Sequence, residues 1–250
     1  MIVGIVGQPN VGKSTFFKAL TLIEVEAANY PFTTIEPNKG IGFVRIECVD
    51  KEFGVQCNPR TGYCIHGQRF IPVELVDVAG LVPGAYEGRG LGNKFLSDLA
   101  HADALIQVID VSGRTDLEGK PSDGSYSNVE KAVQFLETEI DLWFFQILQK
   151  NWSKFAKTHY DSKAKRLEAM SQNLSGIGVN DYHLDVGLRK LGLDEKNFNQ
   201  WTEKEQQVFA SMIRKLSKQI IVAANKMDLP EAKENLKKLQ AKFPERIIIG

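Results

Sequence analysis

The sequence predicts an α/β fold with a mostly parallel six-stranded sheet and a helical insertion. Short apolar runs typical of buried strands alternate with helix-compatible segments. A glycine-rich turn after the first strand fits a phosphate-binding loop. A largely helical stretch, about 112 to 216, separates two strands. We therefore expect one α/β domain in two parts, 1–140 and 217–250, with the helical insertion over 141–216.

The composition is that of an ordinary soluble globular protein. Apolar residues make up 43% and charged residues 25%, and 31 basic residues balance 31 acidic ones. This balance argues against a partner bound by the whole surface, such as nucleic acid or an anionic membrane. No signal-peptide pattern and no apolar stretch near the ~18 residues of a membrane span occurs. An odd, sparse set of three cysteines fits a reducing cytoplasm, so we expect a cytoplasmic protein. We also expect a monomer that does not contact membranes.

The first motif runs from Gly7 to Ser14 and fits the pattern G-x-x-x-x-G-K-[ST]. The buried strand Ile2 to Val6 precedes it, and the helical run Thr15 to Leu20 follows. Backbone N–H groups of such a loop and the positive end of the helix bind phosphate. We expect Lys13 to reach the outer phosphates and the Ser14 hydroxyl to ligate Mg²⁺. The expected nucleotide contacts in this stretch are Gln8, Pro9, Asn10, Val11, Gly12, Lys13, Ser14 and Thr15.

Two later segments are expected to sense the terminal phosphate. The irregular, proline-containing loop before Asn38 holds Thr33 and Thr34, and we favour Thr34 as the ligand of Mg²⁺ and the γ-phosphate. Asp77 ends a buried strand, where it would hold a magnesium-bound water. The N–H of Gly80, three residues later, would contact the γ-phosphate. The expected metal ligands are thus Ser14, Thr34 and Asp77, and Lys13, Thr34 and Gly80 are candidate catalytic contacts.

The runs Ile41 to Val49 and Arg69 to Val76 predict a β-hairpin with a long tip over 51–68. The tip contains Cys57, Cys64 and His66, which suggest a metal site. A structural zinc site needs four ligands, however, and the usual closely spaced cysteine pair is missing. We therefore expect free loop cysteines, which can form a disulfide under oxidising conditions.

The remaining elements follow from apolar periodicity. Thr202 to Glu205 offers a capping box at one helix start, and Ser175 to Gly178 should break a helical hairpin. We expect helices at Gly92 to Ala100, from Val129 onward, Asp181 to Leu191, Thr202 to Lys218 and Glu231 to Phe243, and strands at Ala104 to Asp110, Gln219 to Ala224 and Arg246 to Gly250. We expect the polar stretch from Ser112 to Asn128 to be a surface loop that connects two elements.

The segment from Lys150 to Arg166 holds six basic residues and one acidic residue. Trp152, Phe155 and Tyr160 interleave with them. Cations and stacking faces suit RNA, so this part of the insertion could contact RNA or the ribosome. The alternative is a solvated helix face, which we favour.

The last motif, Asn225-Lys226-Met227-Asp228, follows a buried strand. The Asp228 carboxylate can accept hydrogen bonds from the guanine N1–H and exocyclic amine, a donor pair that adenine lacks. Lys226 can lie across the base and support the phosphate loop. The expected nucleotide-binding residues in this segment are Asn225, Lys226, Met227 and Asp228.

Together these residues resemble the Obg-related GTPases, and most closely the YchF subfamily (Obg-like ATPases) in an archaeal form. The resemblance covers essentially the whole chain. It implies a Ras-like P-loop NTPase G domain interrupted by a coiled-coil-like arm, Mg²⁺-dependent hydrolysis of GTP, and a link to ribosomes. The segments that carry it are Gly7 to Ser14, Asn29 to Asn38, Asp77 to Ala85 and Asn225 to Asp228.

Three departures qualify this resemblance. Leu81 replaces the glutamine that orients the attacking water in many GTPases, and relatives with asparagine at the position of Asn10 can use K⁺ instead, which makes Asn10 a candidate catalytic residue. Several YchF members prefer ATP, but Lys226 and Asp228 favour GTP here. The family continues beyond the position of Gly250 into a TGS domain, so we expect a truncated chain. The alternatives are an ATP-preferring hydrolase and a nucleotide-gated RNA- or ribosome-binding module.

Overall fold

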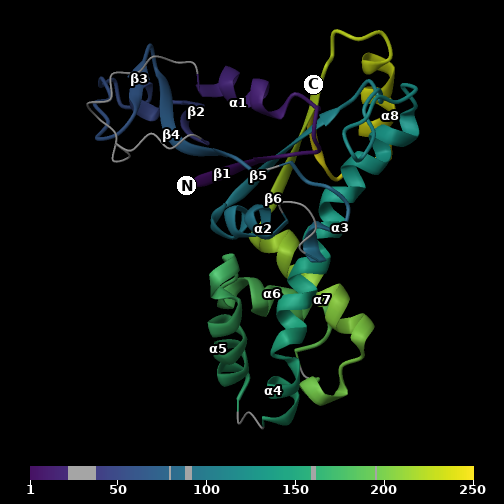
Figure 1. Ribbon diagram of the computed structural model, residues 1–250. Helices are drawn as coiled ribbons and strands as arrows, with labels where there is room; N and C mark the ends of the chain where they lie inside the picture. Colours follow the sequence, from purple (N-terminus) through teal and green to yellow (C-terminus); the bar gives the residue numbers. More distant parts are fainter. Residues whose placement is uncertain (22–37, 79, 88–91, 159–161, 195) are drawn as a thin grey trace.

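The computed structural model describes residues 1–21, 38–78, 80–87, 92–158, 162–194 and 196–250, and within them seven strands form one sheet (Figure 1). Neighbouring strands are parallel except where β4 pairs with β2 and β3. The strand order is β2 (Lys39–Glu47), β4 (Gln68–Asp77), β1 (Ile2–Val6), β5 (Ala104–Asp110), β6 (Gln219–Asn225), β7 (Ile247–Ile249). The short strand β3 (Tyr63–Ile65) pairs with β4 outside this order, so the sheet has one strand more than the six expected.

Helices pack on both faces of the sheet, which explains the nearly continuous apolar runs of its central strands. Val3 and Ile5 of β1 share a buried cluster with Phe16 and Phe17 of α1, whereas Val6 belongs to a cluster that includes α2. A third cluster joins β5 and β6 to α3 and α8. These helices span Lys13–Thr21 (α1), Gly92–His101 (α2), Tyr126–Lys150 (α3) and Ala232–Lys242 (α8).

A helical arm extends from the sheet (Figure 1). The longest helix of the arm is α3. It continues without a break past residue 140, after which we expected the insertion to begin. Of the apolar residues at helical spacing in α3, Val133, Leu136, Ile140 and Phe144 are buried, and Ile147 is partly buried against the same core. The arm also contains α4 (Trp152–Lys157), α5 (Lys163–Leu174), α6 (Asp181–Leu191) and α7 (Glu203–Ser217).

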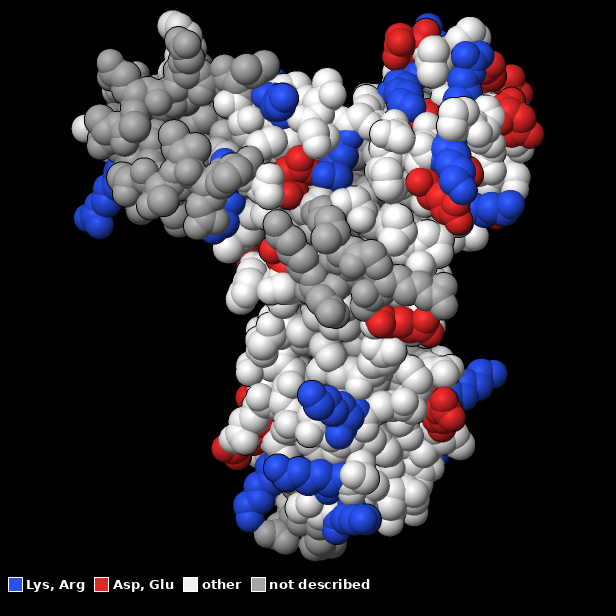
Figure 2. Space-filling view, in the orientation of Figure 1, with Lys and Arg blue, Asp and Glu red and all other residues white. Residues whose placement is uncertain are grey.

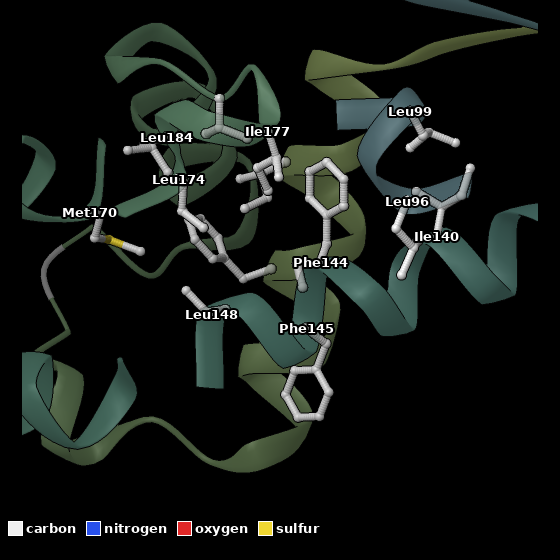
Figure 3. Close-up of a cluster of buried hydrophobic side chains, with 14 of the residues drawn as sticks. Leu96, Leu99, Ile140, Phe144, Phe145, Leu148, Met170, Leu174, Ile177 and Leu184 are labelled. Carbon is white, nitrogen blue, oxygen red and sulfur yellow. The ribbon is translucent and has the colours of Figure 1, made fainter. Parts of the chain in front are cut away.

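The arm has a continuous apolar core that reaches the sheet domain. Figure 3 shows Leu96 and Leu99 of α2, Phe144 and Leu148 of α3, and side chains of α5 and α6 in one cluster. Single-turn 3₁₀ helices complete the chain at Val49–Lys51 (η2), Ala85–Glu87 (η3), Ser175–Ile177 (η4) and Phe198–Gln200 (η5). Among the described residues, no helix combines the length and apolar character needed to cross a lipid bilayer.

Local signals set the helix ends as the sequence predicts. The Thr202 hydroxyl accepts the Glu205 N–H, and the Glu205 carboxylate accepts the Thr202 N–H at 2.7 Å, so the capping box is present. Between α5 and α6, Gly178 adopts a φ of 78°, a left-handed conformation that ends the helical turn.

The aromatic residues of the basic segment pack inside the arm. Phe155 is buried, and the Trp152 ring lies 5.5 Å from Phe198 and 5.2 Å from Trp201. Phe155 is therefore a core residue, and Trp152 is half-buried against the same core, so neither ring is a free stacking face, which corrects that part of the RNA-contact hypothesis. Tyr160 lies outside the described residues.

Candidate functional site

The Gly7–Ser14 stretch forms a tight loop at the carboxyl end of β1, and α1 begins inside it at Lys13. A Cβ atom on Gly7 would lie 2.4 Å from the Val108 carbonyl oxygen of β5, and one on Gly12 (φ 90°) would lie 2.4 Å from the Asn225 amide nitrogen. Both positions therefore require glycine, because a neighbouring atom occupies the space that a side chain would need. Val11 and Gln8 are buried, and the Gln8 amide nitrogen makes no hydrogen bond among the described residues.

Lys13, Ser14 and Asp77 meet beside this loop. The Lys13 ammonium pairs with Asp77 Oδ1, and the Ser14 hydroxyl donates to Asp77 Oδ2 at 2.9 Å. A hydroxyl and a carboxylate side by side are the oxygen donors that Mg²⁺ prefers, and the carboxylate already accommodates a cation. The residues present therefore fit the magnesium site expected from the sequence. Thr34, the third expected ligand, lies outside the described residues.

The segment after β4 returns to the phosphate loop. The Leu81 N–H donates to the Gly7 carbonyl at 3.0 Å, and a Cβ atom on Gly80 would lie 3.4 Å from Pro9. The Leu81 side chain is 1% exposed and belongs to the core shared with α2 and α3. This side chain is therefore buried in the core and carries no group that could hydrogen-bond a water.

The Asn225–Asp228 segment follows β6 and lies against the same loop. The Asn225 amide donates to the Val11 carbonyl at 2.9 Å. Lys226 has a φ of 62°, unusual for a lysine, and its ammonium donates to Asp110 at 2.7 Å. Asp228 is exposed, and Met227 packs against the cluster beneath α8.

Asp110 and Thr115 are site residues that the sequence did not reveal. The Lys226 ammonium also donates to the Thr115 hydroxyl at 3.1 Å, and this hydroxyl donates to Asp110 at 2.6 Å. Burial acts to raise the pKa of Asp110, but hydrogen bonds from Lys226, Ser112 and Thr115 outweigh it and hold that pKa below its ordinary value. The available signal was the position of Asp110 at the end of a buried strand neighbouring β6.

The Ser112–Asn128 connection is more than a surface loop. The Asn10 side-chain amide donates to the Gly119 carbonyl at 2.8 Å, and Asn10 itself is left-handed with a φ of 64°. This bond uses the side-chain nitrogen of Asn10, and its side-chain oxygen, Oδ1, is the atom predicted to bind a cation. Thr15 is exposed on the first turn of α1. The structure thus brings the described candidates for nucleotide and magnesium binding to one edge of the sheet.

Comparison with known proteins gives the family. Residues 2–148, more than half of the chain, match the family model described as 50S ribosome-binding GTPase. The chain is 50% identical over 248 residues to an uncharacterized GTP-binding protein of Methanocaldococcus jannaschii, covering 99% of this chain and 62% of that protein. It is 47% identical over 108 residues to the ribosome-binding ATPase YchF of Haemophilus ducreyi, covering 42% of this chain and 27% of that protein.

A solved structure agrees with these matches. The crystal structure of a GTP-binding protein from Pyrococcus horikoshii aligns with a TM-score of 0.78 at 37% identity, over 100% of this chain and 63% of that one. The chain therefore spans less than two thirds of the length of these relatives. The fold is that of a P-loop GTPase domain, and the chain belongs to the 50S ribosome-binding GTPase family, among its YchF-type members.

Proposed function

We propose that this chain is the nucleotide-binding part of a magnesium-dependent switch that hydrolyses GTP to GDP and phosphate and acts with the ribosome. The observation that carries the proposal is the convergence of Lys13, Ser14 and Asp77 at a loop that Asn225 ties to the Lys226–Asp228 segment. Parallel strands β1, β4 and β6 end at this edge, where ligands of open α/β sheets bind.

In this proposal, Lys13 leaves Asp77 and moves to the phosphates when nucleotide binds. Ser14, Thr34 and a water held by Asp77 would hold Mg²⁺, which when bound neutralises charge on the phosphate oxygens. Loop N–H groups and Lys13 stabilise the charge that develops on the transferring phosphoryl group. No described side chain at the site offers itself as a general base, and the buried Leu81 cannot orient water. Catalysis would rest on positioning and charge, with Asn10 Oδ1 as a K⁺ ligand.

The preference for guanine or adenine decides whether the protein uses GTP or ATP. The exposed Asp228 carboxylate supports guanine. The alternative, an ATP-preferring hydrolase, is supported by the name of the Haemophilus ducreyi relative, a ribosome-binding ATPase. Calorimetric titration with GDP and with ADP tests both, and we expect GDP to bind at least about tenfold more tightly, a difference of about 1.4 kcal/mol. Tighter binding of ADP would overturn the guanine assignment.

Loss of binding in a Lys13→Ala variant checks that the titrated site is the phosphate loop. Thermal unfolding of this variant shows whether it is folded. If the folded variant binds GDP as the wild type does, the nucleotide site lies elsewhere.

A ribosome or RNA contact through the arm is supported by the family description and by exposed lysines of α4 and α5. Figure 2 shows Lys and Arg side chains over the lower part of the arm, while both charge signs mix around α8. Part of this charge is paired, because Lys163 lies 2.7 Å from Asp185. The alternative is a nucleotide-gated binding module in which turnover is incidental.

A further inference from the structure

The tip of the β2–β4 hairpin, residues 48–67, has almost no apolar core. Apolar side chains that would normally form such a core face the solvent instead: Val49 is 59% exposed and Phe53 is 73% exposed. Residues 51 to 56 are all exposed, whereas Cys48 and the charged Asp50 are buried. A segment this poor in apolar contacts generally needs a disulfide or a metal ion to hold one conformation.

The three cysteines of the chain converge inside this tip. Cys48 follows β2, Cys57 lies in the loop, and Cys64 lies in β3. Their sulfur atoms all lie within 4.8 Å of one another, and all three are free. The sequence suggested Cys57, Cys64 and His66 as the metal-binding candidates; in the structure Cys48 joins the two cysteines, and His66 is exposed.

Asp50 gives a second, independent indication that a cation binds here. Its Oδ2 atom accepts hydrogen bonds from the Cys57 N–H at 3.2 Å and the Cys64 thiol at 3.4 Å. Its Oδ1 atom is buried and makes no hydrogen bond among the described residues, although the side chain is only 6% exposed. A buried carboxylate oxygen without a partner is costly unless a cation or donor faces it.

We propose that this tip binds one Zn²⁺ ion through the thiolates of Cys48, Cys57 and Cys64, beside the Asp50 carboxylate. Zinc–sulfur bonds of about 2.3 Å put the sulfurs of a tetrahedral site about 3.8 Å apart. The sulfurs here, within 4.8 Å of one another, need to contract by at most about 1 Å. Each thiol loses its proton on binding, and the fourth position is filled by Asp50 or water. Three sulfurs favour a thiophilic metal over magnesium or calcium.

The site is separate from the nucleotide edge. Figure 1 shows β3 and the outer end of the hairpin projecting from one side of the sheet, away from α8 and the arm. The ion would therefore fix the shape of the tip and would not participate in the reaction at the phosphate loop.

Titration of the reduced chain with Zn²⁺ and with Co²⁺ tests the proposal. We expect one equivalent of either metal to bind, with thiolate-to-cobalt charge-transfer bands and the intense visible bands of tetrahedral Co²⁺. Bound Zn²⁺ should also slow tryptic cleavage after the exposed Lys51 and Arg60. Absence of metal binding by the folded, reduced wild type would overturn the proposal.

Three variants distinguish residues that bind the Zn²⁺ ion from residues that only lie near it. Cys57→Ser should lower the affinity for Zn²⁺ at least about 100-fold, whereas Asp50→Asn should lower it about ten- to hundredfold, as expected for a supporting group. His66→Asn is the matched control, because asparagine tolerates the φ of 50° at this position, and it should bind like the wild type. Wild-type affinity in folded Cys57→Ser would overturn the proposal.

Discussion

The side-chain amide of Asn225 donates a hydrogen bond of 2.9 Å to the main-chain carbonyl of Val11, a residue 214 positions earlier in the chain. This single contact joins the segment expected to select the base to the loop expected to hold the phosphates. The amide nitrogen also occupies the space that a Cβ atom on Gly12 would need. This contact therefore holds together the two segments that we propose bind the base and the phosphates.

Replacing Asn225 by alanine should weaken nucleotide binding without unfolding the protein. Loss of one hydrogen bond of this kind costs about 1 kcal/mol, so calorimetry should show about fivefold weaker binding of GDP. Asn173→Ala is the matched control, because its amide also donates to a main-chain carbonyl, that of Ala169, but in the arm. Equal affinities of the wild type and Asn225→Ala for GDP would show that the Asn225–Val11 hydrogen bond does not contribute to nucleotide binding.

An Asp228→Asn variant should exchange guanine selectivity for xanthine selectivity. The amide offers a donor where the carboxylate accepted two hydrogen bonds, and xanthine carries an oxygen in place of the exocyclic amine of guanine. We expect GDP to bind about 100-fold less tightly, and xanthosine diphosphate to bind more tightly than GDP. Titration of both nucleotides measures this, with the exposed Glu203→Gln as the control. Unchanged GDP affinity would place the base elsewhere.

If Asn10 ligates K⁺, GTP hydrolysis by the wild type should be at least about tenfold faster in potassium than in sodium. The variant to use is Asn10→Gly, because a φ of 64° would strain alanine. This variant should hydrolyse GTP equally slowly in both salts, while GDP affinity reports that the loop is intact. Equal wild-type rates in sodium and potassium would exclude the ion.

The Asp110–Lys226 pair should make stability depend on acid pH. Because the pKa of Asp110 in the folded protein lies below its ordinary value of 3.8, its stabilisation is present above pH 3.8 and is lost as the pH falls through the folded-state value. At neutral pH, Asp110→Asn should lower the free energy of unfolding by about 1–3 kcal/mol, since Lys226 loses its charged partner.

Urea unfolding at several pH values measures this difference. The gap between wild type and Asp110→Asn should narrow below pH 3.8. Asp185→Asn, which removes the charge from a half-buried carboxylate that pairs with Lys163 and Arg189 at the surface of the arm, should cost no more than about 1 kcal/mol at neutral pH. A gap for Asp110→Asn that stays constant with pH would show that the charge of Asp110 does not contribute.

Charge reversal tests the contact between the arm and RNA or ribosomes. Lys154, Lys157 and Lys165 are exposed, and Lys163 is kept as the ion-pair partner of Asp185. Changing the three exposed lysines to glutamate should lower ribosome binding at moderate salt at least about tenfold if they face phosphates. The control makes the same charge change at exposed positions outside α4 and α5: Lys204, Lys233 and Lys237. If both triple variants bind ribosomes equally well, the lysines of α4 and α5 only form a solvent-exposed surface and do not contact the ribosome.

Much of the fold could be predicted because its signals are local. Apolar runs marked β1, β5 and β6, and Thr202 with Glu205 marked the start of α7. The phosphate loop was recognisable because its spacing and its strand and helix neighbours all lie within about twenty residues. The short strand β3 was not, since three residues become a strand only by pairing with β4.

The sequence by itself determined which residues of the candidate site lie at the ends of strands: Lys13 and Ser14 after β1, Asp77 at the end of β4, and Asn225 to Asp228 at the end of β6. Only the tertiary structure decided which of them touch. Parallel pairing of β5 with β6 sets Asp110 beside Asn225, and this register brings Lys226 to Asp110. Antiparallel pairing of β2 and β3 with β4 likewise brings Cys48 to Cys64. The physical reason is the same in both cases: strand register is fixed by burial of whole sheet faces, so contacts between distant residues follow from packing and leave no local signal in the chain.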